Sequence, residues 1–193
     1  MREGSQPAAM DSLIRNVWVC DATGKRKTSI LMQDGRIAAL GPAAEAAAGS
    51  PAVRGPVITI DLEGRDNLVL MPAFVEPHAH LRDPGLTHKE TLESGLLAAA
   101  AGGYGSLVCM GNTLPVLDDP ALVRSLHERA HALGLCDLFP VLTLSRGMEG
   151  RDKSHLEGLG REQALACGVR LLSEDGKDLE VAAFCWEVFG RIG

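Results

Sequence analysis

The sequence predicts a mixed α/β protein in which a small all-β region precedes a region of alternating strands and helices. Before residue 70, short apolar segments are separated by turn residues. After it, strand-length apolar segments alternate with helix-length ones, and polar residues gather where the strands end. We therefore expect a β domain at residues 1–70 and, at residues 71–193, a parallel sheet with right-handed crossovers.

The composition is that of a globular protein with an aliphatic core. Of 193 residues, 46% are hydrophobic and only 4% aromatic. A net charge of −6, with no basic run longer than residues 24–27, argues against a nucleic-acid partner. The sequence contains neither a signal-peptide core nor an apolar run of membrane-spanning length, so we expect a cytoplasmic protein with no membrane partner.

The cysteine pattern predicts reduced, mostly buried thiols rather than disulfides. The five cysteines are far apart, form no C-x-x-C pair and are odd in number: Cys20, Cys109, Cys136, Cys167 and Cys185.

The first domain is expected to consist of short antiparallel strands, at residues 13–20, 28–32, 37–40, 57–61 and 68–71. Asp34 and Gly35 are typical of a tight hairpin turn. Residues 43–48 fit either a short helix or an alanine-rich loop. Residues 1–11 are polar and small, which is typical of a loose terminus.

The second domain is expected to contain four strand–helix units joined by short loops. The apolar run from residue 68 to 75 predicts a buried strand that leads into His78, and further strands are expected at residues 106–110, 138–142 and 169–172. Helices are expected at residues 89–101, 118–133 and 179–189. A further helix is expected to end with residues 162–166.

The polar residues that follow these strands predict a site at one edge of the sheet. His78 and His80 are two residues apart on a strand, so their side chains project to the same face and can share a metal ion. Arg82 keeps the same parity. Asn112 and Thr113 follow the second strand, and residues 173–176 follow the fourth. A His-x-His pair can also be an ordinary surface pair, but its position at the end of a buried strand favours a site.

A series of motifs now identifies a family. The run VEPHAHLRDPG at residues 75–85 is followed in order by KET, SG, AAAAGG, MGNTLP and, at residues 173–176, SEDG. From about residue 13 to its end, the chain resembles the long bacterial type of dihydroorotase, in the metal-dependent amidohydrolase superfamily. The resemblance implies a (β/α)8 TIM-type barrel, with residues 71–193 as its N-terminal half of about four units, and a β-sandwich-like domain before it.

The resemblance also implies an activity and a site. The activity is the interconversion of N-carbamoyl-L-aspartate and dihydroorotate in pyrimidine biosynthesis, with one or two zinc ions. His78, His80 and Asp175 match metal ligands, whereas Arg82 and Asn112 match residues that hold the substrate carboxylate. A planar guanidinium suits bidentate carboxylate binding.

Other groups that the resemblance implies have no counterpart in the chain. The general base, an aspartate, is expected beyond Gly193, together with two further histidine ligands, so no catalytic residue is assigned and we expect the isolated chain to be inactive. The remaining histidines are expected to be surface or helix residues: His88, His127, His131 and His155.

Several positions depart from the family pattern. Ala73 stands in place of glycine, Glu76 in place of aspartate, Gly111 in place of proline, and Glu174 in place of the first of two aspartates. Arg170 lies in the expected fourth strand, where hydantoinase-type relatives have a metal-bridging carboxylated lysine.

Two alternatives remain open. One is a catalytically silent, dihydroorotase-like scaffold for aspartate carbamoyltransferase, and the other is a different cyclic amidase such as an allantoinase. The scaffold alternative is disfavoured because the predicted metal-binding and substrate-binding residues are all present. The allantoinase alternative is disfavoured by Arg82 and Arg170. The expected partners are a small-molecule substrate and either a second copy of the chain or aspartate carbamoyltransferase.

Overall fold

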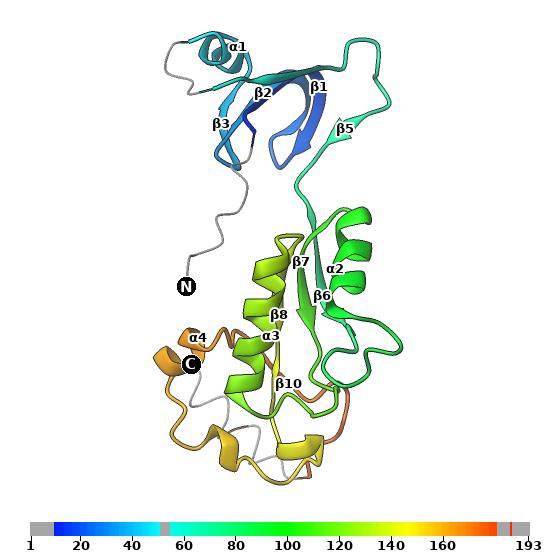
Figure 1. Cartoon of the computed structure of the whole chain (residues 1–193), viewed down its shortest axis with the longest axis vertical. Helices are drawn as coiled ribbons and strands as arrows, with labels where there is room; N and C mark the ends of the chain where they lie inside the picture. Colours follow the sequence, from blue (N-terminus) through cyan, green and yellow to red (C-terminus); the bar gives the residue numbers. More distant parts are fainter. Residues whose placement is uncertain (1–9, 51–54, 181–185, 187–193) are drawn as a thin grey trace. The chain divides into compact units, whose positions relative to one another are not determined.

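The computed structural model describes residues 10–50, 55–180 and 186 (Figure 1). The chain divides into two compact units, residues 1–72 and 73–193. The helix predicted at residues 179–189 lies largely, and Cys185 wholly, outside the described residues.

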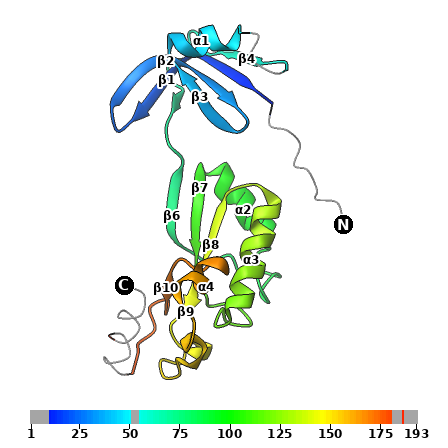
Figure 2. The same ribbon diagram turned by 90° about the vertical axis from the view of Figure 1, so that its left-hand side faces the viewer.

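The first unit is a curved β-sheet with one short helix against it. The strands run in the order β3-β2-β1-β4, and β5 also pairs with β1. Figure 2 shows α1 lying over this sheet. The elements are β1 (Ser12–Asp21), β2 (Gly24–Gln33), β3 (Arg36–Leu40), α1 (Pro42–Ala48), β4 (Ile58–Asp61) and β5 (Val69–Leu70).

The predicted hairpin and the short helix are both present in this unit. Asp34 and Gly35 have positive φ angles of 48° and 71°, which gives the tight turn between β2 and β3. The helical alternative for the alanine-rich segment is confirmed, and Ala44 of α1 packs on Leu13 and Leu31 in the core. Sheet and helix thus bury a small common core.

The prediction that all strands of this unit are antiparallel was wrong. β4 and β5 pair with β1 in parallel, with Ser12 opposite Ile58 and Trp18 opposite Val69. The reason is the connection between β3 and β4: it includes α1, and it joins strands that lie at opposite edges of the β3-β2-β1-β4 order. Such a crossover returns the chain in its original direction, whereas a hairpin reverses it.

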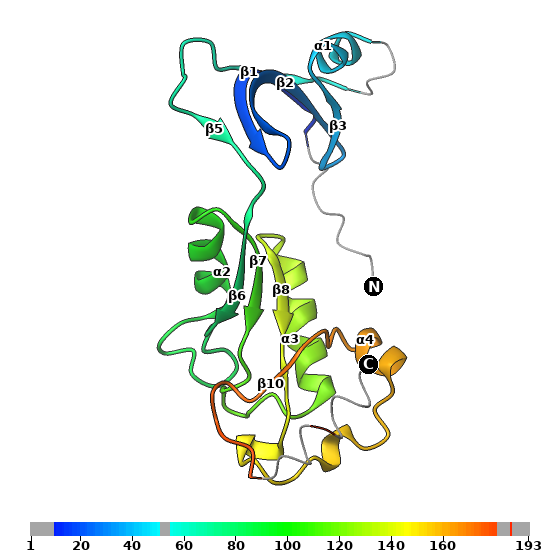
Figure 3. The same ribbon diagram turned by 180° about the vertical axis from the view of Figure 1, so that it is seen from behind.

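The second unit begins with a parallel three-stranded sheet in the order β6-β7-β8, with two helices on one face. Figure 2 shows α2 and α3 together on that face, and Figure 3 shows the sheet from the opposite side. The elements are β6 (Phe74–Ala79), α2 (Leu92–Ala101), β7 (Tyr104–Cys109), α3 (Pro120–Leu133) and β8 (Asp137–Pro140). The predicted alternation of strands and helices is confirmed for these elements.

Both helices begin later than predicted because side-chain caps fix their starts. Thr91 and Ser94 form a reciprocal capping box, so α2 starts at residue 92 rather than 89. The Asp119 carboxylate caps α3, which starts at residue 120 rather than 118. Gly134, with a φ angle of 63°, ends α3 where the sequence predicted.

The last described part of the unit departs further from prediction. β8 is followed by β9 (Leu142–Thr143), which pairs in parallel with β10 (Leu172–Ser173) in a separate two-stranded sheet. Between them lie two 3-10 turns, η1 (Arg146–Met148) and η2 (Ser154–Leu156), and α4 (Arg161–Ala166). The expected short loop is therefore a long one, at residues 144–160, and the fourth strand is shorter than predicted.

The unit's core lies between the sheet and its helices, and leaves β6 largely exposed. Leu96 of α2, Leu107 of β7 and Leu126 of α3 are buried in one cluster. By contrast, Phe74 is 49% and Val75 66% exposed. The prediction that residues 68–75 form one buried strand was therefore wrong. The segment is divided between β5 and β6, and β6 is an edge strand with β7 as its partner among the described residues.

The four described cysteines are free, as predicted: Cys20, Cys109, Cys136 and Cys167. Burial raises the pKa of the Cys109 thiol to about 11. Within the described ranges, no helix is both long and apolar enough to cross a lipid bilayer.

Candidate metal centre

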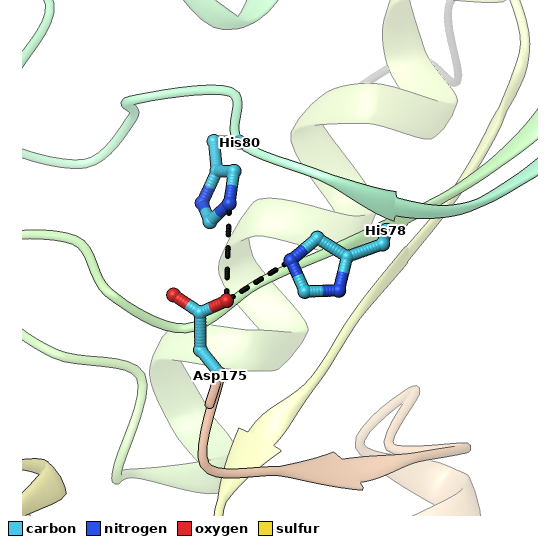
Figure 4. Close-up of side chains that lie close together, drawn as sticks. All are labelled: His78, His80 and Asp175. Atoms are coloured by element: carbon cyan, nitrogen blue, oxygen red, sulfur yellow. Dashed lines mark ion pairs between the residues drawn. The ribbon is translucent and has the colours of Figure 1, made fainter. Parts of the chain in front are cut away.

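Three side chains of metal-ligating type meet at the C-terminal ends of β6 and β10. Figure 4 shows the rings of His78 and His80 facing the carboxylate of Asp175. The Oδ1 atom of Asp175 lies 3.0 Å from Nε2 of His78 and 3.8 Å from Nε2 of His80. The centroids of the two imidazole rings are 5.2 Å apart, and the ring planes meet at 68°. Strand alternation brings the histidines to one side, as predicted, and the loop after β10 brings the carboxylate to them.

The spacing of these donor atoms fits a single metal ion. One donor atom from each residue can be chosen so that all three lie within 4.8 Å of one another. Tetrahedral zinc with bonds of about 2.0–2.1 Å to nitrogen and oxygen separates its ligand atoms by about 3.3 Å, which lies between the two measured distances. Imidazole nitrogen and carboxylate oxygen are also donors that zinc prefers. The donor set therefore suits zinc with three protein ligands.

Glu76 supports the backbone beneath the first histidine. Its Oε1 accepts a hydrogen bond of 3.0 Å from the backbone N–H of His78. Sequence reasoning noted Glu76 only as a departure from the family's aspartate. The contact shows that the longer side chain turns back along its own strand and holds the residue two positions ahead.

The loop that carries Asp175 is anchored by its neighbour Glu174. Only 6% of Glu174 is exposed. Its carboxylate accepts hydrogen bonds from the backbone N–H groups of Leu144 (2.9 Å) and Ser145 (3.1 Å), and from the Ser145 hydroxyl. The same hydroxyl accepts a 2.7 Å bond from the backbone N–H of Gly150. The loop that carries Asp175 is thereby joined to the loop after β9.

Sequence reasoning missed Ser145, because a single serine in a loop carries no local signal of a partner 29 residues away. The backbone of Asp175 itself is in the left-handed region, with a φ angle of 48°. Its N–H donates to Oγ of Ser173 at 3.0 Å. Local and distant contacts together hold an unfavourable backbone conformation at Asp175, the candidate carboxylate ligand.

The two residues predicted to hold a substrate carboxylate lie in adjacent loops. Asn112 follows β7, and its Oδ1 is 2.9 Å from Nδ1 of His80. Arg82 is half-buried, has a φ angle of 58°, and has no ion-pair partner among the described residues. The cation is thus left uncommitted two residues after the second histidine.

Gly85 and Leu114 show how closely these two loops approach. The backbone N–H of Leu114 donates to the carbonyl of Pro84 at 3.1 Å. Gly85 has a φ angle of 83°, and a Cβ atom added there would lie 1.7 Å from the Leu114 carbonyl oxygen. Glycine is required at this position both by the backbone conformation and by the lack of space.

Asp83 ties the Arg82 loop to α3. Both of its carboxylate oxygens accept hydrogen bonds from the Arg129 guanidinium, at 2.9 and 2.7 Å, and only 4% of Asp83 is exposed. The bonds from Arg129 hold the pKa of the Asp83 carboxyl below its usual value. The loop that bears Arg82 is consequently fixed to the helical layer.

The other four histidines do not belong to the cluster with Asp175. His88 and His131 are exposed, as predicted. His127 and His155 are half-buried, and each has a ring nitrogen 2.8 Å from a backbone carbonyl, that of Leu138 and that of Thr143 respectively. His155, predicted to be a surface or helix residue, lies in the 3-10 turn η2, and its ring contacts the backbone of β9.

Arg170 lies just before β10 rather than within it. It is exposed, and its guanidinium donates to the Leu165 carbonyl at 2.8 Å. The side chain is therefore engaged with the end of α4.

Comparison with known proteins confirms the predicted family resemblance. The sequence model of the Dihydro-orotase-like family matches residues 67–183. A dihydroorotase from Thermus aquaticus is 42% identical over 171 residues, which are 88% of this chain and 36% of that protein. A dihydroorotase from Deinococcus radiodurans is 50% identical over 107 residues, or 55% of this chain and 24% of that protein. The chain thus spans about a third or less of the length of these relatives.

Solved structures give the same fold. The L-hydantoinase (dihydropyrimidinase) of Arthrobacter aurescens matches with a TM-score of 0.55 and 23% identity, over 72% of this chain and 29% of that one. A D-hydantoinase from Bacillus sp. AR9 matches with a TM-score of 0.60 and 18% identity, over 94% of this chain and 37% of that one. These similarities show a mixed α/β fold similar to that of the two hydantoinases.

Proposed function

Since the chain belongs to the Dihydro-orotase-like family, we propose that the whole protein is a zinc-dependent dihydroorotase of pyrimidine biosynthesis, acting in the cytoplasm. The reaction is the interconversion of N-carbamoyl-L-aspartate and dihydroorotate. The observation that carries the proposal is the convergence of His78 and His80 on one carboxylate oxygen of Asp175. The proposed fold is a (β/α)8 barrel, of which residues 71–193 supply the N-terminal half.

In this proposal, His78, His80 and Asp175 hold the metal. Bound zinc lowers the pKa of a coordinated water and polarises the amide carbonyl of the substrate. A scaffold protein would need none of the three ligands, so their shared geometry favours an enzyme over a silent subunit.

Arg82 and Asn112 bind and orient the substrate carboxylate in this proposal. An uncommitted guanidinium can form two parallel hydrogen bonds to a carboxylate. The contact between the loops at Pro84 and Leu114 supports a joint role, because it keeps the backbones that carry the two side chains at a fixed separation. Proton transfer is left to a general base outside residues 1–193.

Zinc binding by the 193-residue chain tests the metal centre directly. We expect zinc to bind in competition with a chromophoric chelator, and His78→Ala and Asp175→Ala to weaken that binding by more than tenfold. His88→Ala is a matched control, because His88 is exposed and does not belong to the cluster of His78, His80 and Asp175. Equal zinc affinity in all four proteins would refute the metal centre.

Ligand binding tests the substrate. We expect the zinc-loaded chain to bind dihydroorotate in preference to dihydrouracil, which lacks the carboxylate, and Arg82→Met to abolish the preference while zinc content is retained. Hydrolysis of dihydroorotate by the isolated chain is expected to be undetectable. Turnover that disappears in His78→Ala would show instead that the chain completes its own site.

A further inference from the structure

The contact between His80 and Asn112 bears on which ring nitrogen of His80 carries the hydrogen. Nδ1 of His80 is 2.9 Å from Oδ1 of Asn112, and Nε2 of the same ring faces Asp175. Both residues are half-buried, so the contact is partly shielded from water. One imidazole therefore has a polar partner at each nitrogen.

The chemistry of imidazole fixes the direction of this hydrogen bond once Nε2 is the metal-binding atom. A neutral ring has one N–H and one lone pair, and the lone pair must be on the nitrogen that coordinates. Nδ1 of His80 then carries the hydrogen and needs an acceptor. Of the two ends of the Asn112 amide, only the oxygen can accept.

We propose that Asn112 is a positioning residue of the metal centre, whose side-chain oxygen accepts the Nδ1 hydrogen of His80 and so presents Nε2 to the metal as the lone-pair nitrogen. This inference rests on the metal centre proposed above. The other histidine lacks such support: among the described residues, no side-chain acceptor lies against Nδ1 of His78, and 55% of its side chain is exposed. His80 is thus the pre-oriented member of the pair.

The same contact divides the two ends of the Asn112 amide between two tasks. With the oxygen held by His80, the NH2 group remains a donor and can serve a substrate carboxylate. Asn112 then joins the metal ligand and the substrate through a single rigid group. Aspartate at this position would keep the acceptor but lose the donor, and leucine, with the same branching and number of side-chain heavy atoms, would lose both.

These two substitutions test the proposal by zinc affinity, which needs no catalytic turnover. For Asn112→Leu we expect zinc to bind about 10–100-fold more weakly than to the wild-type chain, the usual cost of removing an outer partner of a ligating histidine. Asn112→Asp should bind zinc at least as tightly as wild type. Wild-type affinity in Asn112→Leu would overturn the proposal, as would an equal loss in both variants.

A second measurement follows the proton itself and does not depend on affinity. Long-range 1H–15N spectra of the zinc-loaded chain, with the His80 signals assigned by His80→Gln, should show Nδ1 of His80 protonated. Metal coordination through Nδ1, with the proton on Nε2, would overturn the proposal. Failure of the wild-type chain to bind zinc would instead remove the metal centre itself, so the two failures are distinguishable.

Discussion

The loop at residues 82–85 and the loop at residues 173–176 each hold a candidate site residue in place, but they are anchored to the rest of the unit by different contacts. Each holds a functional candidate, Arg82 or Asp175, with its backbone in the left-handed region. In each, the adjacent residue is a buried carboxylate, Asp83 or Glu174, that anchors the loop. The loops differ in what binds that carboxylate.

Asp83 is held chiefly by a side chain, and Glu174 by the backbone and a buried serine. The Arg129 side chain that binds Asp83 is half exposed, so it can turn to water if the carboxylate is lost. The backbone N–H groups of Leu144 and Ser145 have no such freedom. Two equally buried carboxylates can therefore differ in how much their loss lowers the free energy of unfolding. A buried N–H group that is left without an acceptor costs more than an arginine that can be rehydrated.

The largest expected effect that tests this comparison is that of Glu174→Leu. Two backbone N–H groups and the Ser145 hydroxyl lose their acceptor. At about 1–3 kcal/mol for each unsatisfied buried group, partly relieved by rearrangement, we expect the free energy of unfolding to fall by about 3 kcal/mol. Urea unfolding followed by circular dichroism measures it. Zinc affinity should fall as well, because the Asp175 loop is released.

Glu157→Leu is the matched control for that variant, since Glu157 is exposed and its carboxylate has no partner among the described residues. Glu174→Gln should lie between the two, because the amide keeps one acceptor oxygen. Equal stability of Glu174→Leu and Glu157→Leu would mean that the Glu174 anchor contributes nothing.

Asp83→Asn should have a smaller effect, about 1–2 kcal/mol at pH 7, because the half-exposed Arg129 is rehydrated. The pKa of Asp83 in the folded chain is below its ordinary value of 3.8. Its contribution is therefore fully present above that value and is lost as the pH falls through the folded pKa.

The difference in unfolding free energy between wild type and Asp83→Asn should accordingly be constant from pH 7 to pH 5 and shrink below about pH 3.8. Unfolding at a series of pH values measures it. A difference that grew on acidification would have the wrong sign for a depressed pKa and would assign the effect to another group.

The smallest effect is expected for Arg151→Ala. Arg151 bonds Glu180 at 2.6 Å, but both side chains are more than half exposed. Surface pairs of this kind contribute about 0–1 kcal/mol, so the melting temperature should stay close to that of wild type. A loss as large as that of Asp83→Asn would show that exposure is a poor guide to these pairs.

The parts of the fold and site that could be predicted from sequence were those with a local pattern. Two-residue alternation brought His78 and His80 to one side, and the position of Asp175 after a strand brought it to the same end of the unit. Asp34 and Gly35 gave their hairpin for the same reason. Each of these needs only its neighbours in the chain.

What could not be predicted depends on contacts between distant segments. The hydrogen bond between Glu174 and Ser145 joins residues that are 29 positions apart, and the sequence around either residue contains no pattern that predicts the contact. The parallel pairing of β4 with β1 depends on where α1 carries the chain. The exposure of Val75 depends on its place at a sheet edge, which its apolar surroundings in the sequence conceal.

Gly85 offers a practical criterion for sorting related sequences. A side chain at this position cannot coexist with the Leu114 carbonyl at its observed place. A homologue that retains both histidines and Arg82 but carries any other residue at position 85 must hold these two loops apart. In newly sequenced genomes, a substitution at this glycine would therefore identify homologues whose loop arrangement differs, even where both histidines and Arg82 are unchanged.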